Sequence, residues 1–528
     1  MNLHIVVSDH LDPAGWDVLR SAPDVTLAGP FEDRAAVLDA VAAAAAIIIR
    51  SGTQADRELI DRAPGLRVIA RAGAHLENVD IDEATRRGIM VLHVPDANVV
   101  AVAEHTLAML LALARQIPRG NRSLREGRWE RHQIVGRQLK GQTLGVVGYG
   151  RHGRAVAARA QAFGMHVLAF DPYIDFEYAR QQHVEVVPLA EMLARADIVS
   201  LHTAVTPETV GMFNREAFRQ MKTGAWFVNC TRSELVDEGA LLDALDSGQI
   251  GAAALDTFTH EPPPPADPLV QHPHVLAVPH LNQNTRESQR DTSVQVAQQV
   301  LDALCGSDYV NVVNLPFTTD TQYRNIKPYL DLAEKLGKVQ GQLADGFVNR
   351  VELQVTGDGM QRMVRPLAAA LLVGLLHPVD DRAVNYVSAP TMAHEQNIQM
   401  AQVIGLDLVD YPNLISCRVC WEGGERTVAG VLFAGEEARL VQYGSISIDA
   451  RPQGELLFLE NDDVPGVIGK VGMLLGDVGV NIGEWRYGRN EPGGQAVSFI
   501  NLDSECPPEV IARLNALPEV WSAKIVRL

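Results

Sequence analysis

A glycine-rich turn constrains this chain of 528 residues more than any other feature. Residues 143–147 form a short apolar run that predicts a buried strand, and the sequence GYGRHG follows it at 148–153. Residues 155–163 have the pattern of a helix, and 166–170 predict a second strand that ends at Asp171. A strand, a GxGxxG turn, a helix and a second strand in this order are typical of a βαβ unit in a parallel sheet.

The turn has the composition that a bound dinucleotide requires. Gly148 allows the tight turn, Gly150 lets a pyrophosphate approach the main chain, and Gly153 permits close packing of the helix on the strand. The amino terminus of the following helix supplies unpaired N–H groups to the phosphates. Asp171 would accept hydrogen bonds from the adenosine ribose and repel a 2′-phosphate, so NAD is favoured over NADP. We therefore assign the cofactor to Gly148, Tyr149, Gly150, Arg151, His152, Gly153 and Asp171.

Two series of short apolar runs alternate with helical segments over the first 315 residues. In the first series, residues 3–7, 46–49 and 66–70 predict buried parallel strands, because they are apolar without strict alternation. The second series runs from 143 to 281, and residues 101–115 predict a buried helix between the two. The sequence therefore predicts two doubly wound α/β domains, each with a parallel sheet.

The pattern changes beyond residue 315. Residues 328–343 predict a helix, and 347–355 and 427–431 predict strands, as in an α+β domain. From residue 455 onwards the predicted order is strand, helix, strand, strand, helix, strand, which is the ferredoxin-like arrangement. At roughly 150 residues per domain, a chain of this length has room for these additional domains.

Composition excludes several classes of partner. The 46 basic and 65 acidic residues give a net charge of −19, and an acidic surface repels nucleic acid and anionic lipid. The longest apolar stretches, 40–49 and 367–376, are too short to span a bilayer. Five cysteines are too few for a disulfide framework, and Cys417 and Cys420 lack a second pair that would complete a metal site. We therefore expect a soluble, cytoplasmic protein without nucleic acid, membrane or metal partners.

Three side chains that suit acid–base and anion chemistry follow predicted strands of the second series. Arg232, Glu261 and His280 each come at or just after the carboxyl end of a strand. Ligands of open α/β sheets bind at that edge, so the three should converge beside the cofactor. His280 can act as a base at neutral pH, Glu261 can orient its ring, and Arg232 offers a planar fork to a carboxylate. Singly, each is more often a solvated or capping residue, so the interpretation depends on their joint position.

Motifs spread over the whole chain resemble the NAD-dependent D-2-hydroxyacid dehydrogenases. The matching segments are 148–171, 206–209, 229–232, 236–240, 256–263 and 279–281. Further segments resemble the D-3-phosphoglycerate dehydrogenases in particular, and these are 50–51, 71–73, 78–80, 103–105, 463–466 and 479–482. The resemblance is to the long bacterial form, in which an intervening domain and an ACT domain follow the dehydrogenase domains.

The resemblance implies an architecture and a reaction. A discontinuous substrate-binding domain (1–97 and 291–314) would accompany an inserted NAD-binding Rossmann domain (98–290). An intervening regulatory domain (315–453) and an ACT domain (454–528) would follow. The implied reaction is the NAD-dependent oxidation of 3-phospho-D-glycerate to 3-phosphohydroxypyruvate, the first step of serine biosynthesis. A homo-oligomer, either a dimer or a tetramer, is also implied.

The resemblance implies roles for individual residues as well. Arg232 would hold the substrate carboxylate, and His280 would be the acid–base group with Glu261 as its partner. Asp256 would contact the nicotinamide amide. The cofactor site would be completed by Pro207 and Thr231. The substrate would be bound by Arg50, Ser51, Gly73, Ala74 and His75. In the ACT-like tail, an effector serine would be bound by Asn461, Asp463 and Asn481.

Several positions depart from the family pattern and leave alternatives open. The departures on the substrate side are His75, His93, Ser233, Glu234, Asn282 and Gln283. One alternative is a relative that acts on another anionic α-hydroxy compound, such as an α-hydroxyphosphonate. The other is a non-catalytic, ligand-sensing protein, against which the retention of all three catalytic residue types argues. In the tail, Asn461 is not the usual residue of the family, so a tail that only dimerises is the alternative to a serine sensor.

Overall fold

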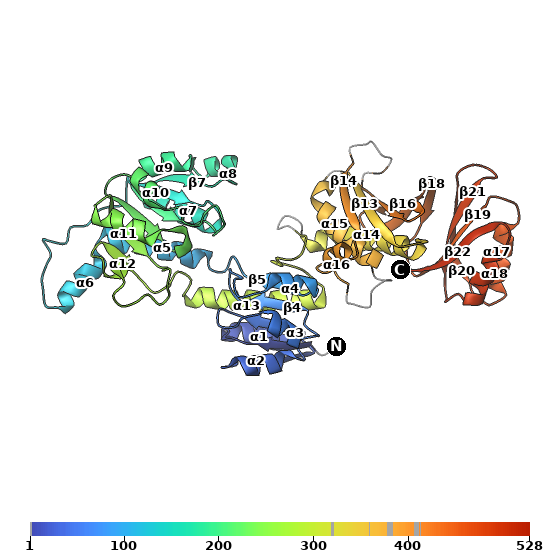
Figure 1. Cartoon of the computed structure of the whole chain (residues 1–528), viewed down its shortest axis with the longest axis horizontal. Coiled ribbons are helices and arrows are strands. Elements are labelled where there is room, and N and C mark those ends of the chain that lie inside the picture. The colour runs from blue at the N-terminus through green and yellow to red at the C-terminus, as the bar shows by residue number, and fades with distance from the viewer. Residues whose placement is uncertain (1–2, 318–321, 358, 377–383, 406–410, 412) are drawn as a thin grey trace. The chain divides into compact units, whose positions relative to one another are not determined.

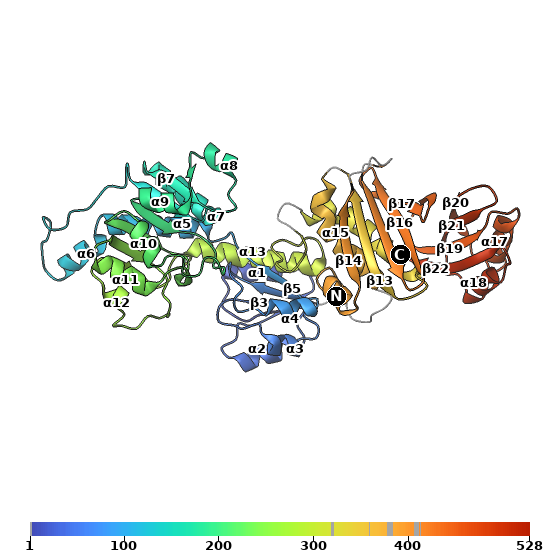
Figure 2. The same ribbon diagram turned by 45° about the horizontal axis from the view of Figure 1, so that its top comes forward.

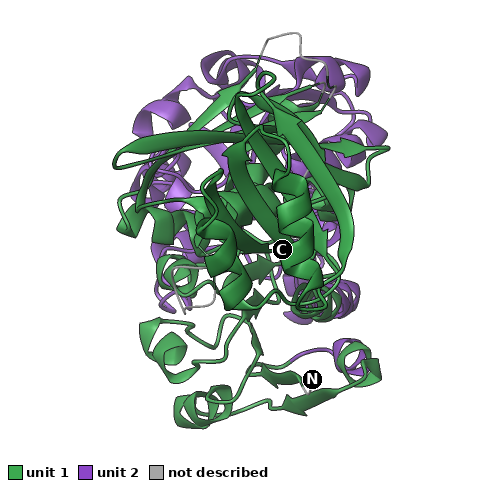
Figure 3. Cartoon of the chain, turned by 90° about the vertical axis from the view of Figure 1, so that its right-hand side faces the viewer, with its two compact units in different colours: residues 1–10, 18–93, 296–528 green, residues 11–17, 94–295 purple. Residues whose placement is uncertain are grey.

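The computed structural model describes residues 3–317, 322–357, 359–376, 384–405, 411 and 413–528. The chain divides into two compact units, which Figure 3 colours separately. The first unit consists of residues 1–10, 18–93 and 296–528, and the second of residues 11–17 and 94–295. Four sheets follow one another along the chain (Figure 1), of which the second belongs to the second unit and the others to the first.

The first sheet is parallel and has the strand order β2-β1-β3-β4-β5. Its strands are β1 (Leu3–Val7), β2 (Val25–Ala28), β3 (Ala46–Ile49), β4 (Val68–Arg71) and β5 (Met90–His93). The helices between them are α1 (Pro13–Ser21), α2 (Arg34–Val41), α3 (Arg57–Arg62) and α4 (Ile81–Arg86). Every residue of β3 and β4 is buried, which explains why these strands read as continuous apolar runs.

The second sheet is also parallel, with the order β12-β11-β10-β9-β6-β7-β8. Its strands are β6 (Thr143–Val147), β7 (His166–Phe170), β8 (Glu185–Val186), β9 (Ile198–Leu201), β10 (Ala225–Asn229), β11 (Ile250–Leu255) and β12 (Val275–Ala277). The strand order reverses at β6, which has β7 on one side and β9 on the other. Such a reversal opens a crevice at the carboxyl ends of the strands, where doubly wound sheets bind their ligands. Both predicted doubly wound sheets are therefore confirmed.

The helices of this region extend the predicted ones. They are α5 (Val99–Ala114), α6 (Ile117–Arg125), α7 (Arg151–Ala162), α8 (Phe176–Gln181), α9 (Leu189–Arg195), α10 (Arg215–Gln220), α11 (Glu238–Asp246), α12 (Pro268–Gln271) and α13 (Arg286–Cys305), with a 3-10 turn η1 (Ser233–Leu235). The helix predicted at 155–163 begins at Arg151, because the glycine-rich turn supplies its first turn. The second half of α13 carries buried apolar side chains, whereas its first half lacks an apolar repeat.

The third sheet has the order β14-β13-β15-β16-β17-β18 and is antiparallel except for the β13–β14 pair. Its strands are β13 (Val348–Thr356), β14 (Gln399–Ile404), β15 (Leu414–Trp421), β16 (Gly424–Phe433), β17 (Glu437–Tyr443) and β18 (Ile446–Ala450). Its helices are α14 (Tyr323–Leu343), α15 (Val364–Leu376) and α16 (Ala389–Glu395), preceded by the 3-10 turn η2 (Met360–Met363). α14 and α15, both labelled in Figure 1, pack on each other and on this sheet, and Figure 2 shows α15 beside β14. The apolar stretch 367–376 is therefore a core helix.

The tail forms the predicted ferredoxin-like sheet, with the order β20-β21-β19-β22 and antiparallel pairs throughout. Its elements are β19 (Glu455–Asp462), α17 (Val467–Gly476), β20 (Ile482–Arg489), β21 (Gln495–Leu502), α18 (Pro508–Asn515) and β22 (Val520–Arg527). Side chains alternate along β19. Leu457 and Leu459 pack among residues of α17 and α18, whereas Leu456 and Phe458 join the core of the third sheet. Both faces of the tail sheet are therefore buried at β19.

Among the described helices, no single one is long and apolar enough to cross a membrane. α5 and α6 reach the required length only as a pair that bends by 61° between them.

Candidate active site

The glycine-rich turn lies between β6 and α7, at the point where the strand order reverses. Gly148 has a φ of +91°, and a side chain there would lie 2.6 Å from the main chain of His202. A side chain at Gly153 would lie 2.0 Å from the carbonyl oxygen of Gly148. At Gly150, which caps α7, nothing lies within 4 Å of the corresponding position. The turn is therefore packed on its inner side and open at the helix terminus, which fits a pyrophosphate.

Asp171 follows β7 and holds the outer side of the same turn. Its carboxylate accepts hydrogen bonds from the main-chain N–H of Tyr149 at 2.9 Å and of Tyr173 at 2.9 Å. The side chain is half-buried and keeps further lone pairs for ribose hydroxyls. The residues present therefore fit NAD, as the sequence predicts.

Asp171 provides the first test of this assignment. We expect Asp171→Asn to raise the KM for NAD about tenfold and to lower the NAD-to-NADP preference by at least as much, because the charge that repels a 2′-phosphate is lost. Asparagine retains one acceptor for the turn. Steady-state kinetics with both cofactors would check this, and an unchanged preference would contradict the ribose assignment.

The predicted acid–base pair is in direct contact. The distance from His280 Nδ1 to Glu261 Oε2 is 2.8 Å, and Glu261 Oε1 accepts a hydrogen bond from the main-chain N–H of Phe258 at 3.1 Å. An ionised carboxylate can only accept, so Nδ1 carries the proton and Nε2 of the neutral ring is left to accept another. The His280 side chain is 30% exposed, so the ring can reach a ligand.

Arg232 follows β10, the neighbour of β11 in the sheet. The amide of Asn229 donates to the carbonyl oxygen of Arg232 at 2.7 Å and accepts from the N–H and hydroxyl of Thr231. This turn fixes the main chain just beyond the strand. Since β10, β11 and β12 are adjacent, the segments that carry Arg232, Glu261 and His280 leave the sheet at one edge. The exposed Pro207 lies in the loop after β9, where the hydroxyl of Thr209 accepts from the N–H of Thr206.

Asp256 is enclosed by protein donors. Its side chain has no exposed surface, and its carboxylate accepts from the main-chain N–H groups of Leu281 (2.7 Å) and Asn282 (3.0 Å) and contacts the ring of His105 (3.1 Å). The turn after β12 therefore covers this side chain. Its contact with the nicotinamide amide stays a prediction.

The predicted substrate residues lie in two loops of the first unit. Arg50 and Ser51 follow β3, while Gly73, Ala74 and His75 follow β4, its neighbour in the sheet. The amide of Asn78 links the two loops by donating to the carbonyl oxygens of Arg50 and Thr53, both at 2.6 Å. The main-chain N–H of Arg50 donates to Asp9 at 2.5 Å. These residues therefore lie together at the carboxyl edge of the first sheet.

Most of the departures from the family pattern have partners within the subunit. The ring of His93 contacts the carbonyl oxygen of Ala74 at 2.8 Å. Asn282 is buried and donates to the carbonyl oxygen of Cys230 at 2.7 Å. The hydroxyl of Ser233 donates to Glu234 at 3.3 Å. These contacts stabilise loops, so the departures do not by themselves indicate another substrate.

The predicted effector residues are not an open site in the subunit. Asn461 is completely buried in the subunit, because β19 lies between two packed faces, and its role as an effector ligand stays a prediction. Asp463 accepts from the hydroxyl of Tyr487 at 2.7 Å, the N–H of Gly493 at 3.0 Å and the guanidinium of Arg489 at 2.7 Å. Tyr487 first, then Gly493 and Arg489, lower the pKa of Asp463 to about 2. Asn481 donates to Asp503.

Sequence reasoning missed two polar links beside the site. The first is the contact of His105 with Asp256. His105 lies on the mostly apolar helix α5, and a lone histidine on the buried side of such a helix is a sequence signal that could have indicated this contact. The amide of Asn98 contacts the ring of His152 at 3.1 Å and donates to Gln283 at 3.1 Å, so it joins the glycine-rich turn to the segment after His280. Burial first, then the charge of Arg151, lowers the pKa of His152, which favours the neutral ring.

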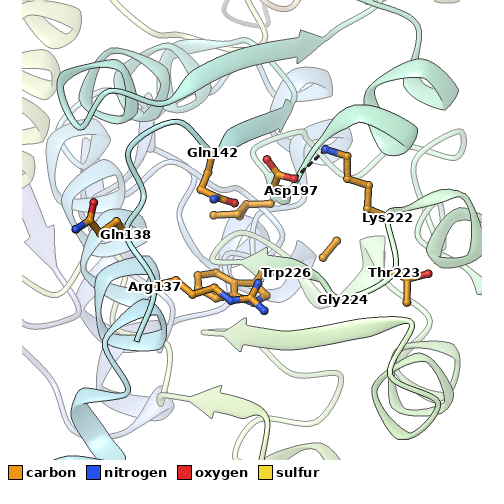
Figure 4. Close-up of a pocket in the computed structure, with 10 residues that line it drawn as sticks. Arg137, Gln138, Gln142, Asp197, Lys222, Thr223, Gly224 and Trp226 are labelled. Carbon is orange, nitrogen blue, oxygen red and sulfur yellow. Dashed lines mark hydrogen bonds and ion pairs between the residues drawn. The ribbon is translucent and has the colours of Figure 1, made fainter. Parts of the chain in front are cut away.

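A separate pocket lies at the opposite edge of the second sheet (Figure 4). Lys222 and Asp197 form an ion pair at 2.8 Å on one side of it, and the guanidinium of Arg137 lies 5.6 Å from the centre of the Trp226 ring. The pocket is at the amino ends of β9 and β10, away from the edge that carries His280. Within the described ranges, no group of three or more histidine, cysteine or acidic side chains is arranged to hold a metal ion.

Comparisons with known proteins agree with this geometry. Residues 107–282 match the NAD binding domain of D-isomer specific 2-hydroxyacid dehydrogenases, and residues 325–444 match the D-3-phosphoglycerate dehydrogenase intervening domain. The D-lactate dehydrogenase of Escherichia coli superimposes with a TM-score of 0.53 and 28% identity, covering 59% of this chain and all of that one. The fold and the site define an NAD-dependent D-2-hydroxyacid dehydrogenase.

Full-length relatives narrow this class. The D-3-phosphoglycerate dehydrogenase of Bacillus subtilis is 37% identical over 92% of both chains. That of Methanocaldococcus jannaschii is 37% identical over 99% of both. The chain belongs to the D-3-phosphoglycerate dehydrogenase family.

Proposed function

We propose that the protein oxidises 3-phospho-D-glycerate to 3-phosphohydroxypyruvate with NAD, as the first step of serine biosynthesis. The contact between His280 Nδ1 and Glu261 carries the proposal, because it provides an oriented base at the edge of the sheet that holds the nucleotide turn. The names of the full-length relatives support phosphoglycerate over other 2-hydroxy acids.

The proposed roles follow the chemistry of the side chains. When bound, the nicotinamide accepts the hydride from the substrate carbon. His280 Nε2 takes the proton of the substrate hydroxyl, and Glu261 stabilises the imidazolium that results. Arg232 pairs with the substrate carboxylate. The remaining contacts to substrate are assigned to Arg50, Ser51, Gly73, Ala74 and His75, and those to the cofactor are completed by Pro207 and Thr231.

We propose the same four domains as the sequence analysis, a division that the four sheets support. The substrate-binding domain would comprise residues 1–97 and 291–314, and the NAD-binding domain residues 98–290. The intervening domain would span 315–453 and the ACT domain 454–528.

Steady-state assays test the substrate. The purified enzyme with NAD would be compared on 3-phosphoglycerate, D-lactate, D-glycerate and an α-hydroxyphosphonate. We expect kcat/KM on phosphoglycerate to exceed that on each of the others by about 100-fold, because a site built for a phosphate rejects analogues that lack it. Higher efficiency on the α-hydroxyphosphonate would refute the phosphoglycerate assignment.

We propose that free serine does not inhibit this enzyme. The burial of Asn461 supports this, as do the three donors that already contact Asp463, which leave little of its carboxylate to an amino acid zwitterion. The expected result is that millimolar serine changes neither kcat nor the melting temperature. An inhibition constant in the millimolar range or below would refute the proposal and restore the effector site.

We propose that the enzyme is a homo-oligomer in the cytoplasm. Exposed apolar side chains on α6 and the segment after it support self-association, because such groups are normally covered. The exposed fractions are 57% for Ile117, 60% for Leu124, 77% for Trp129 and 73% for Val135. All five cysteines are free, which is consistent with a reducing compartment.

A further inference from the structure

We infer that His105 is a positioning residue for the dehydrogenase reaction and acts through Asp256 on the turn that carries His280. The inference rests on the proposed function of His280. It concerns residues on three separate elements, namely α5, the end of β11 and the segment after β12.

The turn at His280 needs external support. His280 has a φ of +50°, in the left-handed region that is strained for a residue with a β-carbon. Its own N–H donates to the carbonyl oxygen of Asp256 at 2.9 Å and also contacts that of Val278 at 3.1 Å. These two bonds fix the start of the turn only.

Asp256 fixes the rest of the turn through its side chain. One carboxylate oxygen accepts from the N–H of Leu281 at 2.7 Å and the other from the N–H of Asn282 at 3.0 Å. Both amides come directly after His280, so the carboxylate holds the main chain on the far side of the strained residue. The direction of the His280 ring toward Glu261 therefore depends on where the Asp256 carboxylate lies.

His105 fixes that carboxylate. Its Nε2 lies 3.1 Å from Asp256 Oδ1, and its side chain is 16% exposed on α5, between Glu104 and Thr106. A buried carboxylate is costly unless its oxygens are paired, and the ring supplies an N–H donor from a rigid element. A donor on α5 thus anchors the catalytic turn to the helix beneath the sheet edge.

Three variants and one control test this. His105→Leu removes the donor, His105→Asn shortens it out of reach, and His105→Gln keeps an amide N–H on a longer side chain. The control is Glu104→Gln, which changes the neighbouring residue of α5, whose side chain is 66% exposed. For each, kcat, KM and NAD affinity would be measured with 3-phosphoglycerate and with the other acids of the substrate panel.

The expected result separates positioning from general loss of structure. His105→Leu and His105→Asn should lower kcat about 10- to 100-fold, the cost of a displaced catalytic group, with NAD affinity within threefold of the parent enzyme. His105→Gln should recover kcat to within about fivefold, and Glu104→Gln should match the parent. Amide hydrogen exchange in the peptide around 276–286 should become faster in His105→Leu but not in the control.

Three outcomes would overturn the inference. They are an unchanged kcat in His105→Leu and His105→Asn, a loss in His105→Gln as large as in His105→Leu, or a loss of kcat matched by an equal loss of NAD affinity. If the parent enzyme oxidises another acid of the panel but not phosphoglycerate, the substrate proposal is wrong. The role of His105 is then decided by hydrogen exchange and by the kinetics of the variants on that other acid.

Discussion

Replacing His280 with glutamine is expected to lower kcat by about 10²- to 10⁴-fold while NAD affinity stays within a few-fold of the parent enzyme. In the proposed function the ring of His280 takes the proton of the substrate hydroxyl, whereas glutamine has no basic nitrogen. Because Nδ1 contacts Glu261 at 2.8 Å, Nε2 is the atom of the ring that remains to accept the proton. No other atom of His280 can take this role.

The measurement combines steady-state kinetics with equilibrium binding of NAD. His274→Gln is a matched control, because His274 is an exposed histidine six residues earlier on the same segment. The control should retain parent activity. If His280→Gln keeps more than a tenth of the parent kcat, His280 is not the acid–base group and the protein must use another base.

Glu261→Gln is expected to lower kcat about 100-fold with a much smaller change in the KM for substrate. The glutamine amide keeps one acceptor oxygen, which can face either His280 Nδ1 or the N–H of Phe258, so the variant also loses one of these two contacts. What is lost in either case is the negative charge that stabilises the imidazolium formed as the hydroxyl proton is taken. The expected loss of kcat therefore arises in proton transfer and not in substrate binding.

The control for this variant is the first residue of α11, whose side chain contacts the loop that carries Glu261. Glu238 accepts a hydrogen bond from the N–H of Thr259 at 2.8 Å and supports the loop without contacting His280. Glu238→Gln should retain kcat within about twofold, since it removes one surface-exposed contact of modest strength. Equal losses in Glu261→Gln and Glu238→Gln would mean that Glu261 only stabilises the loop.

Local sequence patterns were sufficient to predict the nucleotide-binding turn and the candidate residues at the strand ends. Gly148, Gly150 and Gly153 were recognised because their spacing, the preceding strand and the following helix all lie within one short βαβ unit. Glu261 and His280 were placed together because parallel strands bring their carboxyl ends to one edge. The order of elements in the tail followed from alternation of strands and helices along the chain.

Local sequence patterns could not predict contacts between segments that are far apart in the sequence. His105 and Asp256 are 151 residues apart, and their contact depends on how α5 packs against the sheet. Nothing in the residues around Asp256 shows that the turn after β12 covers its carboxylate. Likewise, the burial of Asn461 depends on helices packing on one face of β19 and the third sheet on the other.

The sequence by itself determined the kinds of domain, the cofactor and the acid–base pair, because periodicity, glycine geometry and strand ends are properties of short segments. The tertiary structure alone decided which polar side chains are available to ligands and which are enclosed by protein donors. That difference has a physical cause: a carboxylate such as Asp256 or Asp463 has the same chemistry in either setting, and only the donors that fold around it determine whether its oxygens remain free.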